Sequence, residues 1–135
     1  MEEKLEKVSR LNLELHHDDR GTLVLVGNDV YSQFTRLFCI ANTSKSNSTR
    51  GNHAHRHSTQ IFMCMAGPIK IELFDGKDQY EIELTKFGEA IKVLPMIWSR
   101  QFYSPESILM VMCDTPFSDS EYIHSMTEFL ALTNP

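Results

Sequence analysis

The stretch RGNHAH at residues 50–55, followed by Gln60 and then Gly67, is the most informative part of the sequence for both fold and chemistry. Successive side chains of a β-strand alternate between its two faces, so His53 and His55 are expected to project from the same face. Imidazole is the side chain best suited to moving protons near neutral pH. The stretch therefore predicts a strand that carries two neighbouring proton-transfer groups.

The composition is that of one soluble globular domain. The chain has 135 residues, of which 41% are hydrophobic and 23% are charged, and this length predicts a single domain over residues 1–135. The net charge of −5 argues against a nucleic-acid partner and against an anionic membrane surface. An anionic small molecule is compatible with this charge, because a few arginines can cluster in a cleft.

The cysteines and the apolar segments indicate a cytoplasmic protein. Three cysteines, irregularly spaced in apolar runs, favour reduced and buried thiols over a disulfide framework. The first seven residues are too charged for a signal peptide, and the apolar run at 108–113 is far too short to span a bilayer. The cysteines are Cys39, Cys64 and Cys113.

Short strands separated by turns account for most of the chain. Leucines at 11, 13 and 15 alternate with polar residues, and Asp75-Gly76 is a strong hairpin signal. Such a pattern predicts an all-β sandwich or barrel. The exception is the C-terminus, where Ser118-x-x-Glu121 is a capping box. Apolar residues then recur at helical spacing and require a partner surface, either the barrel or another subunit; they are Tyr122, Ile123, Met126, Phe129 and Leu130.

The ligand set argues against a metal. The spacing of the histidine pair resembles the first cupin motif, in which His-x-His and a later glutamate bind a metal, but the glutamate position holds Gln60. A neutral amide is a poor third ligand. The second motif would supply a histidine after the Pro95 turn, where this chain has Trp98-Ser99-Arg100. We therefore expect no bound metal.

Other candidate binding residues carry a weaker signal. Arg20 and Arg50 each precede a glycine, which lets the backbone approach a ligand, and a guanidinium matches two phosphate oxygens at once. Trp98, the chain's only tryptophan, is as consistent with a core anchor as with a surface that stacks on a base or sugar. Arg100 is a candidate if its side chain points inward.

Several segments together resemble one family, the metal-free cupin nucleotide-sugar 3,4-ketoisomerases, over nearly the full length. The matching segments are Asp19-Arg20-Gly21, 36–40, RGNHAHRHSTQ at 50–60, Asp75-Gly76, 95–98, Phe102 with Ser104-Pro105, and the tail SDSEYIHSMTEFL. The resemblance implies a cupin jelly roll (double-stranded β-helix) with a short C-terminal helix. It also implies a homodimer, often with an exchanged N-terminal strand. The implied role is deoxysugar biosynthesis toward 3-amino-3,6-dideoxyhexoses, either for surface polysaccharides such as lipopolysaccharide or for secondary metabolites.

The resemblance also implies a reaction and its residues. Members of the family act on dTDP-4-keto-6-deoxyglucose and move the ketone from C4 to C3 through an enediol(ate), without a cofactor. His53 would be the base at C3, and His55 would relay protons to and from the oxygens or C4. The substrate-binding residues would be Arg20, Arg50, Gln60, Trp98 and Arg100.

One position departs from the family. Its corresponding strand carries a tyrosine that contributes to the active site, whereas this chain has Phe38 and Cys39. The missing hydroxyl could be replaced by water, by Tyr103 or by nothing, and the configuration of the product at C4 is left open. Three alternatives are a metal-dependent cupin oxygenase, a sugar-nucleotide binding module without catalysis, and a related epimerase.

Overall fold

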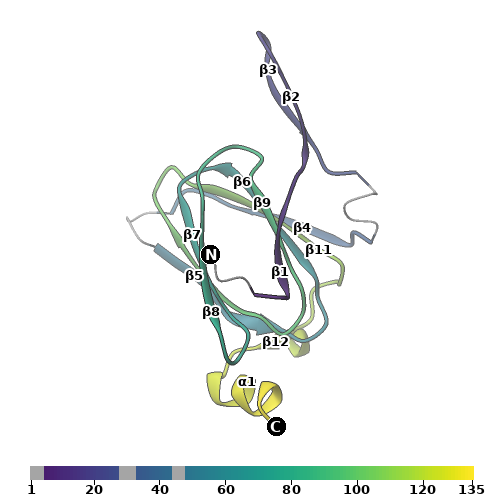
Figure 1. Ribbon diagram of the computed structural model, residues 1–135, viewed down its shortest axis with the longest axis vertical. Coiled ribbons are helices and arrows are strands. Elements are labelled where there is room, and N and C mark those ends of the chain that lie inside the picture. The colour runs from purple at the N-terminus through teal and green to yellow at the C-terminus, as the bar shows by residue number, and fades with distance from the viewer. Residues whose placement is uncertain (1–4, 28–32, 44–47) are drawn as a thin grey trace.

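The computed structural model describes residues 5–27, 33–43 and 48–135, and in these residues two five-stranded antiparallel sheets form the body of the molecule (Figure 1). The first sheet has the order β1-β9-β6-β11-β4. Its strands are β1 (Val8–Leu11), β9 (Ala90–Val93), β6 (Gln60–Ala66), β11 (Ile108–Cys113) and β4 (Arg36–Ile40).

The second sheet has the order β12-β5-β10-β7-β8. Strands adjacent in space are mostly distant in sequence, as expected for the predicted jelly roll. Its strands are β12 (Tyr122–Ile123), β5 (Ser48–His55), β10 (Trp98–Tyr103), β7 (Ile69–Phe74) and β8 (Gln79–Leu84).

Alternation of side chains along the strands builds the core. In β7, Ile69, Ile71 and Leu73 are fully buried, while the residues between them are only partly covered. These inward residues join aliphatic side chains of the first sheet, such as Leu109 and Val111 of β11, in one cluster. Burying such a face is the main favourable term for folding, and the cluster fixes the two sheets that carry the site.

A hairpin of β2 (Glu14–Asp18) and β3 (Gly21–Leu25) stands away from both sheets, at the opposite end from the C-terminal helix (Figure 1). The sequence predicted one strand through residues 11–15, but the chain divides it between β1 and β2. Within one chain the hairpin leaves large apolar side chains uncovered: Leu15, Leu23 and Leu25 are 51%, 56% and 48% exposed.

The predicted C-terminal helix begins later than its capping box indicates. Ser118 makes no capping hydrogen bond, and only a single 3-10 turn, η1 (Asp119–Glu121), follows it. The chain then enters β12, and helix α1 (Met126–Thr133) starts after Ser125, whose side chain accepts a hydrogen bond from the amide of Glu128. The helical prediction for Tyr122 and Ile123 was therefore wrong, because pairing with β5 outweighs the local signal.

Helix α1 covers the outer face of the second sheet. Phe129 is fully buried against Trp98, Ala54 and Ile123. The sheet is thus one of the two partner surfaces that the apolar stripe required. Among the described residues, no helix is long and apolar enough to cross a membrane.

Two further sequence predictions differ from the structure. Strand β10 was not predicted, although it lies in the centre of the second sheet. The cysteines were all expected to be buried, but only Cys64 and Cys113 are; Cys39 is exposed. It lies on β4, an edge strand of the first sheet, and its neighbours Phe38 and Ile40 pack on the core instead.

Candidate active site

A β-bulge in β5 aligns the residues of the histidine stretch. His53 pairs with Ser99 and Gly51 pairs with Arg100, so Asn52 is the extra residue, and Gly51 and Asn52 have φ angles of 81° and 62°. In a regular strand, residues three apart face opposite sides. The bulge cancels this alternation and turns Arg50 to the same side as His53. Arg50 pairs with Gln101 of β10, which also faces inward.

These side chains line a cavity of about 360 Å³ between the two sheets, a size within the usual range for small-molecule sites. Its wall combines apolar and charged groups, with Arg50 and Asp119 as charged residues. The remaining lining residues are Phe38, Ile40, Gly51, His53, His55, Phe62, Gln101, Val111, Phe117, Tyr122 and His124.

His53 is arranged as a base. Its Nδ1 lies 3.1 Å from the carbonyl oxygen of Gly51, and because a carbonyl only accepts, Nδ1 must carry the proton. Nε2 is then the basic nitrogen. Burial, followed by the nearby His124, lowers the pKa of His53 below its ordinary value of 6.5, against the raising effect of the Gly51 carbonyl. The ring is consequently neutral at pH 7.

His55 lies beside it, as the sequence predicted, with the ring centroids 5.1 Å apart. It is only 5% exposed, and neither ring nitrogen has a hydrogen-bond partner within the described residues. Burial, then the neighbouring His53, lowers its pKa to about 4. A buried imidazole with two unsatisfied nitrogens is costly unless a ligand supplies the partner.

Two aromatic residues from the C-terminal segment complete this side of the cavity. The ring of Tyr122 lies 4.9 Å from that of His53 and 4.5 Å from that of His55. His124 stacks on Tyr122 at 5.7 Å. Neither residue was predicted from the sequence as a site residue, because the local pattern favoured a helix in this segment. The only available signal was their alternation around the apolar Ile123.

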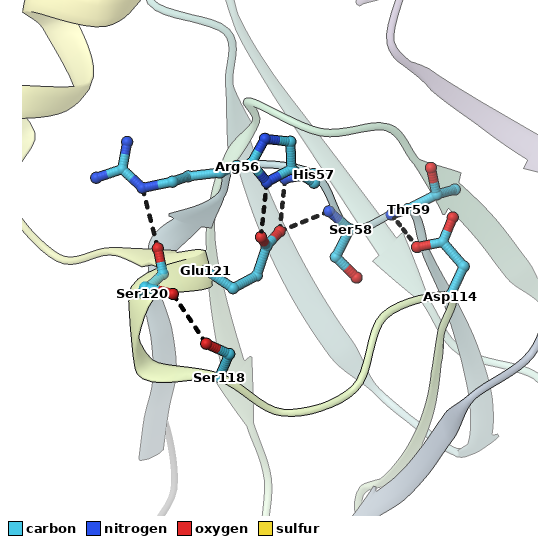
Figure 2. A network of polar contacts seen from close by, with 8 residues as sticks. All are labelled: Arg56, His57, Ser58, Thr59, Asp114, Ser118, Ser120 and Glu121. Carbon is cyan, nitrogen blue, oxygen red and sulfur yellow. Dashed lines mark hydrogen bonds and ion pairs between the residues drawn. The ribbon is translucent and has the colours of Figure 1, made fainter.

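Glu121 holds this segment against the end of β5 (Figure 2). Its carboxylate accepts hydrogen bonds from the backbone amides of His57 and Ser58, at 2.5 and 2.6 Å, and from Nδ1 of His57 at 3.1 Å. Burial opposes ionisation of this carboxyl, but the two amides and His57 keep its pKa below the ordinary value. The network therefore fixes where β12 enters the cavity wall.

Gln60 lies behind the cavity rather than in its lining. The side chain is buried, and Nε2 lies 3.4 Å from Sγ of Cys113. The same sulfur lies 3.6 Å from Nη2 of Arg36. A thiol is a weak partner, so this contact holds the amide only weakly.

The other sequence-predicted site residues lie elsewhere in the single chain. Trp98 and Arg100 face the outer side of the second sheet, where they line a different cavity with Met126 and Leu130 of α1. The Trp98 indole donates to Oδ1 of Asn52, and Arg100 pairs with Glu72. The structure thus does not bring them to the histidines, because β10 presents Ser99 and Gln101 inward instead.

Arg20 is also outside this cavity in the single chain. It lies at the tip of the β2–β3 hairpin, is 86% exposed and forms two-pronged contacts with Asp18.

Among the described residues, no three His, Cys, Asp or Glu side chains are arranged to hold a metal ion.

Comparison with known proteins identifies relatives. The sequence model of the family described as "FdtA: WxcM-like, C-terminal" matches residues 6–134. A TDP-4-oxo-6-deoxy-alpha-D-glucose-3,4-oxoisomerase from Aneurinibacillus thermoaerophilus is 28% identical over 122 residues, covering 88% of this chain and 87% of that protein.

Solved structures are also similar. WlaRA, a TDP-fucose-3,4-ketoisomerase from Campylobacter jejuni, has a TM-score of 0.87 and 28% identity, with 94% of this chain and 96% of that chain covered. The sugar 3,4-ketoisomerase QdtA from Thermoanaerobacterium thermosaccharolyticum, in complex with TDP, has a TM-score of 0.90 and 22% identity, with 96% of each chain covered. The latter likeness concerns the fold, and it confirms the predicted jelly roll.

Proposed function

The chain belongs to the FdtA, WxcM-like C-terminal family, and we propose that it is a nucleotide-sugar 3,4-ketoisomerase. It converts dTDP-4-keto-6-deoxy-D-glucose to a dTDP-3-keto-6-deoxyhexose. The observation that carries this assignment is a neutral imidazole, His53, whose Nδ1 is held by the Gly51 carbonyl so that a basic Nε2 remains for the substrate.

The reaction requires such a base. The ketone at C4 acidifies the proton on C3, and Nε2 of His53 removes it to give an enediolate. Return of a proton to C4 and exchange of protons between the two oxygens move the ketone to C3. Oxidation and reduction occur within one molecule, so the electrons balance without a redox partner. His55, buried at 5.1 Å from His53, relays the proton that returns to C4.

Arg50 supplies the cation for the diphosphate or for sugar oxygens. It lines the cavity on the same side as His53, and its fork suits two oxygens at once. Gln60 supports the site from behind through Cys113. Trp98 and Arg100 line the outer cavity next to α1 and have no part in this mechanism.

The protein acts as a homodimer in which the N-terminal hairpin is exchanged. The hairpin stands away from its own sheets (Figure 1) and exposes Leu15, Leu23 and Leu25, a surface that association with a second copy would cover. Exchange would also carry Arg20 from the hairpin tip toward the partner's site. The reaction takes place in the cytoplasm, and its product serves the synthesis of deoxysugars for surface polysaccharide.

Mixing two inactive variants tests the exchanged dimer. If Arg20 acts on the partner's site, Arg20→Ala and His53→Asn proteins should complement on mixing. Random exchange of subunits makes half of the dimers heterodimers, and each heterodimer has one intact site of two. The mixture should therefore show about a quarter of wild-type turnover. If Arg20 serves its own chain, the mixture stays inactive. Light scattering after size-exclusion chromatography gives the oligomeric state independently, and a monomer would refute the arrangement.

The reaction itself is tested by incubating dTDP-4-keto-6-deoxyglucose with the protein in D₂O and following C3 and C4 by NMR. Deuterium incorporation and a new 3-ketone are expected from the wild type, and neither from His53→Asn, which should still bind TDP. Wild-type turnover by that variant would refute the role of His53. A binding module would bind TDP without exchange, and an oxygenase would contain iron or nickel on elemental analysis.

A further inference from the structure

Tyr122 is placed in the site by strand register. In β12 it pairs directly with His55, and Ile123 pairs with Ala54. Paired residues share a face of the sheet, so Tyr122 faces the cavity with His55 while Ile123 packs under α1. Among the described residues that line the cavity, Tyr122 is the only one with a side-chain hydroxyl.

The oxygen of this hydroxyl accepts a hydrogen bond, whereas its proton has no acceptor among the described residues. Nη2 of Arg36 donates to Oη of Tyr122 at 3.1 Å. A guanidinium has no acceptor, so the contact uses a lone pair of the phenol and leaves the O–H bond for another partner. Arg36 itself is fixed between the rings of Phe38 and Phe117, at 5.4 and 5.6 Å.

We propose that the Tyr122 hydroxyl carries the proton between the two sugar oxygens during isomerisation, with Arg36 as the residue that positions it. The inference rests on the proposed function and deepens it. As His53 takes the C3 proton, Tyr122 gives its proton to O4, which becomes a hydroxyl. As His53 releases this proton and it returns to C4, O3 gives its proton to the Tyr122 phenolate and becomes the ketone oxygen. At the end of the reaction Tyr122 has regained its proton, and no net oxidation or reduction has occurred.

The other candidates for this role fit less well. Phe38, which lines the cavity from β4 of the first sheet, has no hydroxyl. Tyr103 is buried, donates to Oε1 of Gln101 at 3.4 Å, and is not part of the cavity lining. His55 has a pKa lowered to about 4, so little of it is imidazolium at pH 7, and a neutral hydroxyl is the better proton donor to an enolate oxygen there.

The test is Tyr122→Phe, which removes one oxygen and retains the ring that packs on both histidines. With dTDP-4-keto-6-deoxyglucose, kcat should fall by about 10²- to 10³-fold, while the affinity for TDP changes less than about threefold. The ratio of C3 deuteration in unreacted substrate to product formed in D₂O should rise, because proton removal continues while transfer between oxygens stalls. A purely structural role would not change this ratio.

Tyr103→Phe is the matched control and should keep kcat within about threefold of the wild type. An active wild type with an equally active Tyr122→Phe variant overturns the inference and leaves the proposed function intact, whereas an inactive wild type overturns the proposed function. If Tyr122→Phe loses TDP affinity or folds poorly, difluorotyrosine at position 122 decides. Its more acidic phenol should move the alkaline limb of the kcat profile to lower pH, and an unchanged profile refutes the role.

Discussion

The buried His55 should make the protein lose stability in mildly acidic solution. Its pKa is about 4 in the folded chain, against 6.5 as the ordinary value, because burial and then His53 disfavour the imidazolium. Above pH 6.5 the histidine is neutral in both the folded and the unfolded chain, and its full contribution to stability is present. As the pH falls toward 4, the unfolded chain binds a proton that the folded chain does not, so this contribution to the free energy of unfolding is lost. Between pH 7.5 and pH 5.0 these two values correspond to a loss of about 2 kcal/mol in the free energy of unfolding.

Urea unfolding of the wild type and of His55→Gln at both pH values, at one protein concentration, measures this term. The variant removes the titration of this residue and retains that of every other group, so the comparison uses the change with pH and not the absolute stability. We expect the wild type to lose about 2 kcal/mol more than the variant on going to pH 5.0. Equal losses would mean that His55 protonates readily in the folded protein, and the account of a neutral, buried imidazole would be refuted.

Three further substitutions and one control probe the frame around the site. Gly51→Ala should destabilise by about 1–3 kcal/mol and lower kcat, since φ is 81° and a Cβ would lie 2.8 Å from Nε2 of Gln101; urea unfolding and turnover measure this. Glu121→Gln should cost about 1–3 kcal/mol at pH 7, and thermal unfolding should show this difference shrinking as pH falls below 4.5, where the lowered pKa ceases to favour the wild type. Phe129→Ala should cost about 3–5 kcal/mol by urea unfolding, whereas Leu132→Ala, 47% exposed, should change stability by less than about 0.5 kcal/mol.

The shared face of His53 and His55 could be predicted from sequence because it depends only on the two-residue period of a strand, and their ring contact confirms it. The position of Arg50 could not be predicted from the strand period alone. Its side chain joins theirs only because Gly51 and Asn52 form a bulge, and a glycine-asparagine pair in a sequence does not reveal which strand it will be paired with. The roles given to these residues stay predictions until the variants are measured.

The placement of Trp98 and Arg100 could not be predicted, because their segment was not identified as a strand. Once β10 pairs with β5 and β7, its side chains alternate between the two faces of the sheet, so Ser99 and Gln101 point inward and Trp98 points outward. Tyr122 was missed for the converse reason. A capping box and an apolar stripe predicted a helix from local sequence, but a strand pairing between residues 122 and 55, which are distant in the chain, determined the outcome.

The two sides of β12 connect the stability of the C-terminal helix with the chemistry of the site. Ile123 packs with Phe129 of α1 on one side of the strand, while Tyr122 on the other side contacts both histidines. Glu121, just before them, ties the same segment to the amides after β5. A strand of two residues has few hydrogen bonds of its own, so its position depends on these side-chain contacts. Loosening α1 should therefore lower turnover through Tyr122, although no residue of the helix lines the cavity.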